Sequence, residues 1–281
     1  MEPRIGIRNT KSIIFKGIIV FFAFLIALPL IIILLYIVKQ GITQVNWNFL
    51  THVPAPVGEK GGGIANALLG SFIMVIVAAV VAIPVGIAAG IYLSENPNTK
   101  LAYYAGLCVD VLQAVPSIVV GIVIYAWLVK PFSSFSAIAG SLALALMMLP
   151  IVIRSTEQTL LLLPPSLKEA ALSLGVPYHR VMLKVIVPCG FAGILSGITL
   201  SIARVIGETA PLLFTALGNS FLSTSLVKPM ESLPHVIFFY ATSPYDDWHD
   251  LAWGASFILL MFVLTLNIVT KVLTRKWKIQ L

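Results

Sequence analysis

Six long apolar runs most strongly constrain what this chain can fold into. About 20 apolar residues suffice for a helix to cross the hydrocarbon core of a bilayer, and the runs cover roughly residues 13–38, 66–93, 103–129, 136–153, 187–215 and 251–273. The chain is 59% hydrophobic and only 10% charged, which excludes the ordinary soluble class. The sequence therefore predicts an all-α integral membrane protein of six transmembrane helices, forming one domain over residues 1–281.

Basic residues outside the runs predict the orientation. The first run resembles a secretory signal, but it is too long and ends in Lys39 and Gln40 without a small-residue cleavage site, so we expect it to be retained. With the N-terminus inside, 13 of the 18 Lys and Arg residues fall on the cytoplasmic side and four on the outer side. Because cytoplasmic loops are enriched in Lys and Arg, both termini are predicted to be cytoplasmic.

Several kinds of site are not indicated by the sequence. Neither a G-x-x-x-x-G-K-[ST] loop nor a G-x-G-x-x-G turn occurs, so ATP and Mg²⁺ would be bound by another chain. The two cysteines form no CxxC pair and the four histidines are scattered, so we predict no metal site and no cofactor. The net charge of +7 follows from the membrane orientation and needs no nucleic-acid partner.

The cytoplasmic segment 154–186 is predicted to carry a short helix at about 167–174. Two successive prolines stop any helix that enters from the fourth span. Ser166 and Glu169 then have the S-x-x-E spacing of a capping box, and Gly175 suits the left-handed residue that ends a helix. A helix of about two turns, roughly 12 Å long, is marginal alone and should pack against something.

One face of this helix is apolar and has small side chains. Its members recur at i, i+3, i+4 and i+7 and are Leu167, Ala170, Ala171 and Leu174. The residues alone leave two possibilities open. The helix either rests on the lipid surface or its own protein, or it docks into a groove of a partner.

The same loop resembles the EAA signature of ABC importer permeases, which reads E-A-A, three residues, G, nine residues, I-x-L-P. Here Glu169-Ala170-Ala171 precede Gly175 at that spacing, and Val185-Ile186-Val187-Pro188 follow, with Val at two aliphatic positions. The resemblance implies a type I ABC importer permease architecture whose coupling helix sits in a cleft of a cytoplasmic ATPase. The coupling residues would then be Leu167, Lys168, Glu169, Ala170, Ala171, Leu174 and Gly175.

The fifth run contains an intramembrane charge pair. Arg204 and Glu208 are one turn apart on an otherwise apolar segment and are predicted to lie in hydrogen-bonding reach of each other. Ser201 and Thr215 are predicted to share the face of this pair. Pro211 is predicted to bend the segment. An Arg at mid-membrane costs roughly 2.5–3.5 kcal/mol, so it should face the bundle interior or water. The pair either locks helices together or acts as a gate for an anion, since an Arg fork suits a tetrahedral oxyanion.

Asp110 is a second membrane-level acid, about two turns into the third run from the cytoplasm. It would pair with Arg154 or a cation of a partner near an inner gate, or its carboxylate would reach water at the interface. Gln113, one turn further on, shares these alternatives.

Four stretches are similar to the PstA-type permease subunits of phosphate-specific ABC importers: "GGGIANALLGS" at 61–71, "AVPSIVVGIVIY" at 114–125, "LPIVIRSTE" at 149–157 and "IGETAPLLFTAL" at 206–217. The resemblance implies import of inorganic phosphate across a bacterial cytoplasmic membrane. It also implies a homologous second permease, two copies of an ATPase and an extracytoplasmic phosphate-binding protein as partners. Arg204 and Glu208 match the family's intramembrane pair, which is thought to matter for phosphate passage.

Two other functions stay open at this stage. One is a permease for another oxyanion, such as sulfate or molybdate. The other is a secondary transporter coupled to protons through Glu208. An enzyme is disfavoured, because the buried polar residues offer no nucleophile–base pair and no metal set.

Overall fold

The computed structural model describes residues 3–56, 59 and 61–275, and this part of the chain is helical, with two isolated β-bridges and no strand. Four helices are long and apolar enough to cross a membrane unbroken: α1 (Pro3–Gly41), α3 (Ala65–Glu95), α7 (Ala137–Leu161) and α14 (Asp246–Arg275). They cover the predicted first, second, fourth and sixth runs. The all-α membrane fold is therefore confirmed for the described residues.

The predicted third span is not one helix. It consists of α4 (Lys100–Ala114), α5 (Ser117–Ile124), the π-helical turn η1 (Tyr125–Val129) and α6 (Lys130–Phe132), and the chain bends by 104° between α4 and α5. Pro116 lies at the bend and Val115 before it has an extended ψ of 129°. Proline explains this break, since it lacks an N–H donor and disfavours a helical residue before it.

The predicted fifth span, 187–215, is also broken. It is entered by α9 (Tyr178–Val181), η2 (Met182–Ile186) and α10 (Val187–Cys189), bends by 70° at Gly190, and continues as α11 (Phe191–Val205). The chain then leaves the helix and forms α12 (Ala210–Thr215). Counting each bent pair as one span gives up to six crossings, in agreement with the predicted number.

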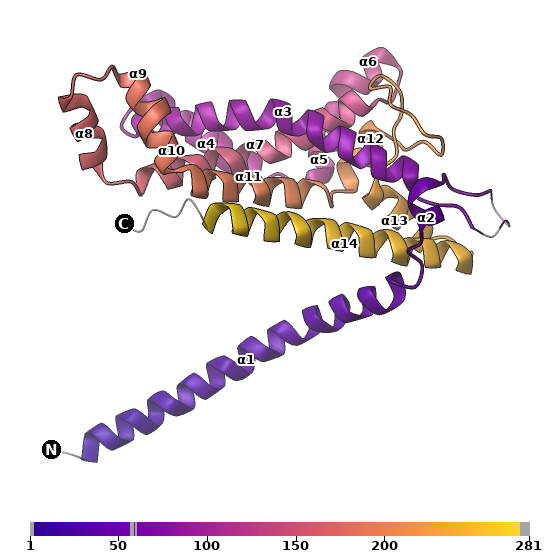
Figure 1. The fold of residues 1–281 in the computed structure, drawn as a ribbon, viewed down its shortest axis with the longest axis horizontal. Helices are drawn as coiled ribbons and strands as arrows, with labels where there is room; N and C mark the ends of the chain where they lie inside the picture. The colour runs from indigo at the N-terminus through magenta and orange to yellow at the C-terminus, as the bar shows by residue number, and fades with distance from the viewer. Residues whose placement is uncertain (1–2, 57–58, 60, 276–281) are drawn as a thin grey trace.

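Helix α7 lies at the centre of the bundle, between α3 and α11 (Figure 1). Glycines allow both neighbours to approach closely: a Cβ on Gly90 of α3 would lie 2.6 Å from Cβ of Thr156, and one on Gly197 of α11 would lie 2.2 Å from Cβ of Ser155. Small residues at such crossings let helix backbones pack in lipid, where burial of apolar surface gives no driving force. The main apolar core includes Met74 of α3, Leu144 of α7 and Val205 of α11, so it joins the same three helices.

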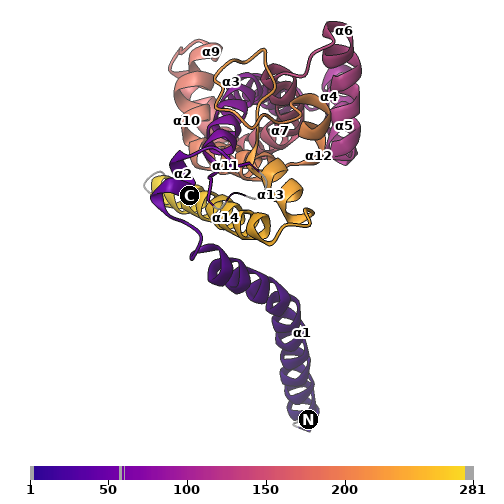
Figure 2. The same cartoon turned by 90° about the vertical axis from the view of Figure 1, so that its right-hand side faces the viewer.

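Helix α1 stands away from the bundle as an arm (Figures 1 and 2). None of its most apolar 18-residue stretch is buried. Its contact with the bundle is at its C-terminal end, where Tyr36 stacks edge-on against Trp253 of α14 with ring centroids 5.1 Å apart.

Predicted inner and outer segments lie at opposite ends of the bundle. The short helix α8 (Pro165–Ser173) lies at the end of the bundle where α14 ends, and α2 (Trp47–Thr51) and α13 (Leu233–Ala241) lie at the other end (Figure 1). The last two helices fall in the predicted outer segments and were not predicted. Each is too short to give a spanning signal in the sequence.

Candidate functional site

Helix α8 exists where a short helix was predicted, but its start differs. The predicted capping box is wrong: Pro164 is the N-cap, Pro165 is the first helical residue, and no side chain caps the N-terminus. The proline ring presets the helical φ and lacks the N–H that a cap would have to satisfy, so the helix begins one residue before Ser166. Gly175 ends the helix at φ +74°, as predicted.

The predicted apolar face of α8 divides between two environments. Leu167 and Ala171 pack against an apolar cluster of the chain itself, which includes Val181 and Met182. Ala170 is exposed, and Leu174 has 83% of its surface exposed. One side of α8 therefore rests on its own protein, and docking of the uncovered side into a partner stays a prediction.

An ion-pair cluster fixes α8 to the C-terminal end of α3. The ammonium of Lys168 and the phenol of Tyr178 both donate to Oε2 of Glu95, and the Lys168 Nζ lies 5.0 Å from the centre of the Tyr178 ring. Burial alone lowers the pKa of Lys168, but the hydrogen bond and charge of Glu95 more than offset it and raise that pKa. Sequence reasoning missed Glu95 and Tyr178, because 73 residues separate Glu95 from Lys168.

Arg204 and Glu208 lie together at the point where α11 ends. Arg204 Nε and Glu208 Oε1 are 3.7 Å apart, so the two form an ion pair without a direct hydrogen bond. The expected hydrogen-bonding reach is wrong because α11 ends at Val205, which leaves Glu208 in a turn. The Arg204 side chain is 46% exposed and that of Glu208 is 19% exposed, so the guanidinium faces out of the bundle in this subunit.

Thr215 does not share a helix with Arg204, contrary to the prediction, whereas Ser201 lies three residues before Arg204 on α11. The break at 206–209 separates α11 from α12, and Pro211 lies in the first turn of α12 rather than at a bend. Both hydroxyls are fully buried and donate to carbonyls of their own helices, Ser201 to Ile198 and Thr215 to Pro211.

Asp110 pairs with Arg154, one of the two partners considered. The guanidinium of Arg154 lies 2.6 Å from Oδ1 of Asp110, also contacts Glu157 at 2.7 Å, and donates to the carbonyl of Gly106 at 2.8 Å. This network ties α4 to α7 beside the bend of the third span. Gln113 is exposed, and a role for it or for Asp110 in an inner gate stays a prediction.

A second polar pair lies at the opposite end of the bundle, in the predicted outer segment 216–250. His235 Nδ1 and Oε1 of the buried Glu231 are 2.5 Å apart. Gly218, at φ +85°, passes so close that a Cβ there would lie 2.7 Å from Oε2 of Glu231. Tyr240 lies nearby, and burial together with the Glu231 charge raises the pKa of Tyr240 to about 12.

Comparison with known proteins decides the family. The family model described as binding-protein-dependent transport system inner membrane component matches residues 82–278. The chain belongs to this family. The match includes α7, the α8 loop, the Arg204–Glu208 pair and all of α14. Its members are inner-membrane components of transport systems that depend on a binding protein, and this chain is a multi-pass member.

Curated relatives of this inner-membrane component carry the name "Phosphate transport system permease protein PstA". The protein of that name from Yersinia pestis is 44% identical over 250 residues, which is 89% of this chain and 85% of the relative. The one from Haemophilus influenzae is 42% identical over 85% of each chain. A probable one from Methanocaldococcus jannaschii is 35% identical over 92% of each chain. The resemblance seen in the sequence motifs is confirmed.

Solved structures agree on the fold. A chain of the inward-facing MetNI methionine ABC transporter superposes with a TM-score of 0.66 at 17% identity, over 77% of this chain and 96% of that chain. At that identity the likeness concerns the fold alone. It supports the ABC importer permease architecture expected from the EAA loop.

Proposed function

We propose that this chain is a permease subunit of an ATP-driven importer that moves inorganic phosphate into the cytoplasm by alternating access. The observation that carries the proposal is the high identity, over nearly the whole chain, to curated phosphate transport permeases. The chain itself would hydrolyse no ATP. ATP and Mg²⁺ would be bound by two copies of a cytoplasmic ATPase, and a second, homologous permease would complete the membrane pathway.

Arg204 is the residue we assign to phosphate in the pathway. Its guanidinium is half exposed and lies 3.7 Å from its acidic partner, Glu208, so it has donors to spare. An arginine fork can bind two oxygens of a tetrahedral oxyanion at once. Glu208 repels an anion unless the pair separates, and the pair would therefore close without substrate and open around it. Ser201 and Thr215 are fully buried, and their hydroxyls donate to carbonyls of their own helices.

The uncovered side of α8 is the surface we assign to the ATPase. It presents Glu169, Ala170 and Leu174, while Lys168 holds the helix to the end of α3. A movement of the ATPase would thus be passed to α3 through an ion pair as well as through the backbone. This arrangement requires α8 and both termini to face the cytoplasm, and it requires an extracytoplasmic phosphate-binding protein at the α13 end.

The test is uptake of radiolabelled phosphate into proteoliposomes that hold the assembled transporter, with its binding protein on one side and ATP on the other. Arg204→Gln should stop uptake and leave the complex assembled, and Lys130→Gln at the outer end should leave uptake intact. Glu169→Lys should release the ATPase. Excess sulfate or molybdate should not compete, and collapse of the proton gradient at constant ATP should not matter.

Each alternative has its own outcome in this assay. Competition by sulfate would indicate a permease for another oxyanion, and loss of uptake with the proton gradient would indicate a secondary transporter. Normal uptake by both Arg204→Gln and Glu169→Lys would refute the roles assigned to the pair and to α8.

A further inference from the structure

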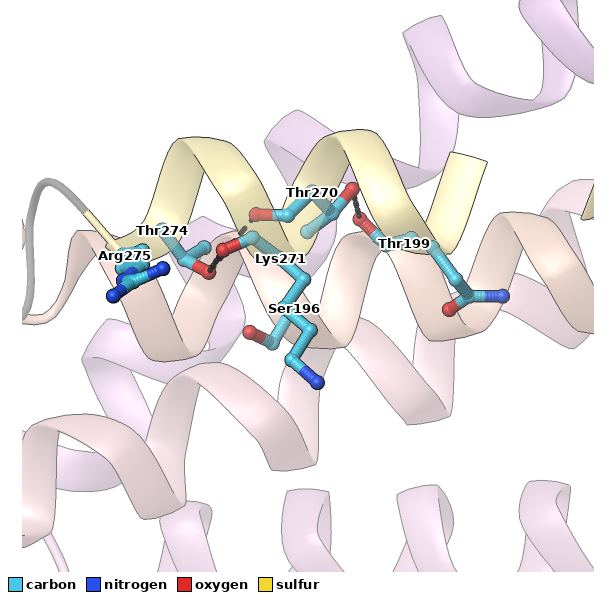
Figure 3. Close-up of a pocket in the computed structure, with 7 residues that line it drawn as sticks. Ser196, Thr199, Thr270, Lys271, Thr274 and Arg275 are labelled. Atoms are coloured by element: carbon cyan, nitrogen blue, oxygen red, sulfur yellow. Dashed lines mark hydrogen bonds between the residues drawn. The ribbon is translucent and has the colours of Figure 1, made fainter. Parts of the chain in front are cut away.

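A polar groove of about 860 Å³ lies between the inner ends of α11 and α14 (Figure 3). All seven residues that line it are polar, two of them are cations, and none is a carboxylate. Thr199 of α11 and Thr270 of α14 meet across it, with their hydroxyl oxygens 2.8 Å apart. The groove is therefore an interhelical site rather than a gap between side chains at the surface of one helix.

Helix α14 keeps a polar stripe on the side that faces the groove. Asn267, Thr270, Lys271 and Thr274 recur at i, i+3, i+4 and i+7. The other side exposes the apolar residues Ile268, Val269 and Val272. Polar side chains are expensive in a membrane-spanning helix and face a bundle interior or a wet cavity. Such a stripe indicates a polar occupant of the groove.

The groove has positive charge to offer. Lys271 and Arg275 are one turn apart and exposed, and among the described residues neither forms an ion pair. The hydroxyls of Thr199 and Thr274 donate to carbonyls of their own helices, at 2.9 Å in each case, and can turn toward an anion instead. Two adjacent cations with nearby hydroxyls suit a phosphate group.

We propose that this groove binds a phosphate group through Lys271 and Arg275, assisted by Thr199 and Thr270. Two sources have this chemistry. One is inorganic phosphate that leaves the pathway toward the cytoplasm. Ser196 of the groove lies on one uncovered face of α11 together with Leu200 and Arg204. Along this face the groove lies about 12 Å from Arg204, on the inner side. This source rests on the proposed function. The other is the headgroup of an anionic phospholipid of the inner leaflet, and this source does not depend on the proposed function.

The test compares binding by assembled transporters that all carry Arg204→Gln, so that the pathway arginine contributes nothing. In nanodiscs of phosphatidylcholine, without binding protein, equilibrium binding of radiolabelled inorganic phosphate is measured. In nanodiscs that also contain phosphatidylglycerol, the immobilised fraction of spin-labelled phosphatidylglycerol is measured. The groove variant is Lys271→Gln with Arg275→Gln, and its matched control is Lys100→Gln with Lys184→Gln, which removes the same charge from the same side.

We expect the groove variant to weaken binding of one probe on the order of tenfold, because it removes two charge-assisted contacts, and the control to leave binding unchanged. A loss for inorganic phosphate alone identifies an exit site, a loss for phosphatidylglycerol alone identifies a lipid site, and a loss for both identifies a site open to both. No loss for either probe, or an equal loss in the control, overturns the proposal.

Neither binding assay requires transport, so a failure of the phosphate-uptake test would leave the outcome of the binding assays independent. Thr199→Val changes no charge and almost no volume, and it is the second variant should the double change prevent assembly. It should weaken the same probe several-fold because a hydroxyl donor is lost. Unchanged binding by Thr199→Val would then refute the site.

Discussion

Replacing Glu95 by Gln tests whether α8 is held mechanically to α3. The substitution keeps the shape of the side chain and removes the charge that accepts from Lys168 and Tyr178. A hydrogen bond to a charged group stabilises by ~1.5–3 kcal/mol and a neutral one by ~0.5–1.5 kcal/mol. The Lys168 side chain is 32% exposed and that of Glu95 is 14% exposed, so solvent screening weakens the ion pair between them. We therefore expect Glu95→Gln to cost about 1–2 kcal/mol of the free energy that holds α8 on α3.

A loss of that size raises the population of undocked α8 by a factor of about 5–30. Amide hydrogen exchange over residues 165–173 of the nucleotide-free assembled transporter should accelerate by that factor, and ATP hydrolysed per phosphate imported should rise. Asp250→Asn, at an exposed acid in the N-terminal part of α14, is the matched control and should change neither quantity. In a double-mutant cycle with Lys168→Met, a coupling energy near zero would refute the reasoning.

Three further predictions concern stability. Gly90→Ala should lower the thermal unfolding midpoint of the transporter, because the new Cβ would lie 2.8 Å from the Ile153 carbonyl oxygen and overpacking costs ~1–3 kcal/mol. Gly17→Ala is the control and should not lower the midpoint, because nothing lies within 4 Å of its new Cβ. Equal midpoints for the two variants would contradict this. Arg154→Gln should speed hydrogen exchange across α4, since Asp110 and Glu157 lose their shared cation; unchanged exchange would show that the network does not hold α4. Folding raises the pKa of Tyr240 to about 12, so the stability that this phenol contributes is complete below about pH 10 and is lost as pH rises through 12. The free energy of unfolding should therefore fall less steeply at alkaline pH in Tyr240→Phe than in the wild type. Identical pH profiles would refute this.

The local parts of the site were predictable from short stretches of sequence. Gly175 ends α8 because a left-handed residue is needed there, and a run of apolar residues is enough to indicate a spanning helix. The prediction of a capping box failed within the same helix. Pro165 and Ser166 both favour a helix start, and the proline prevailed one residue earlier than the serine.

Other parts depended on neighbours that the sequence does not reveal. Pro116 was visible as a helix breaker, but the 104° bend depends on how α5 packs on α12, where Gly121 allows the backbone of Pro211 to come close. Likewise, spacing alone placed Arg204 and Glu208 on one helical turn. The end of α11 at Val205 separated them to 3.7 Å.

The sequence by itself determined that this chain spans a membrane up to six times and to which family it belongs. These properties depend on composition and on motifs of a few residues, whose physical effects are local. Only the tertiary structure decided that α8 is tied to Glu95, that Asp110 pairs with Arg154, and that α11 and α14 enclose a cationic groove. Each of these contacts joins residues more than 40 positions apart, and their meeting depends on how helices pack rather than on any local preference.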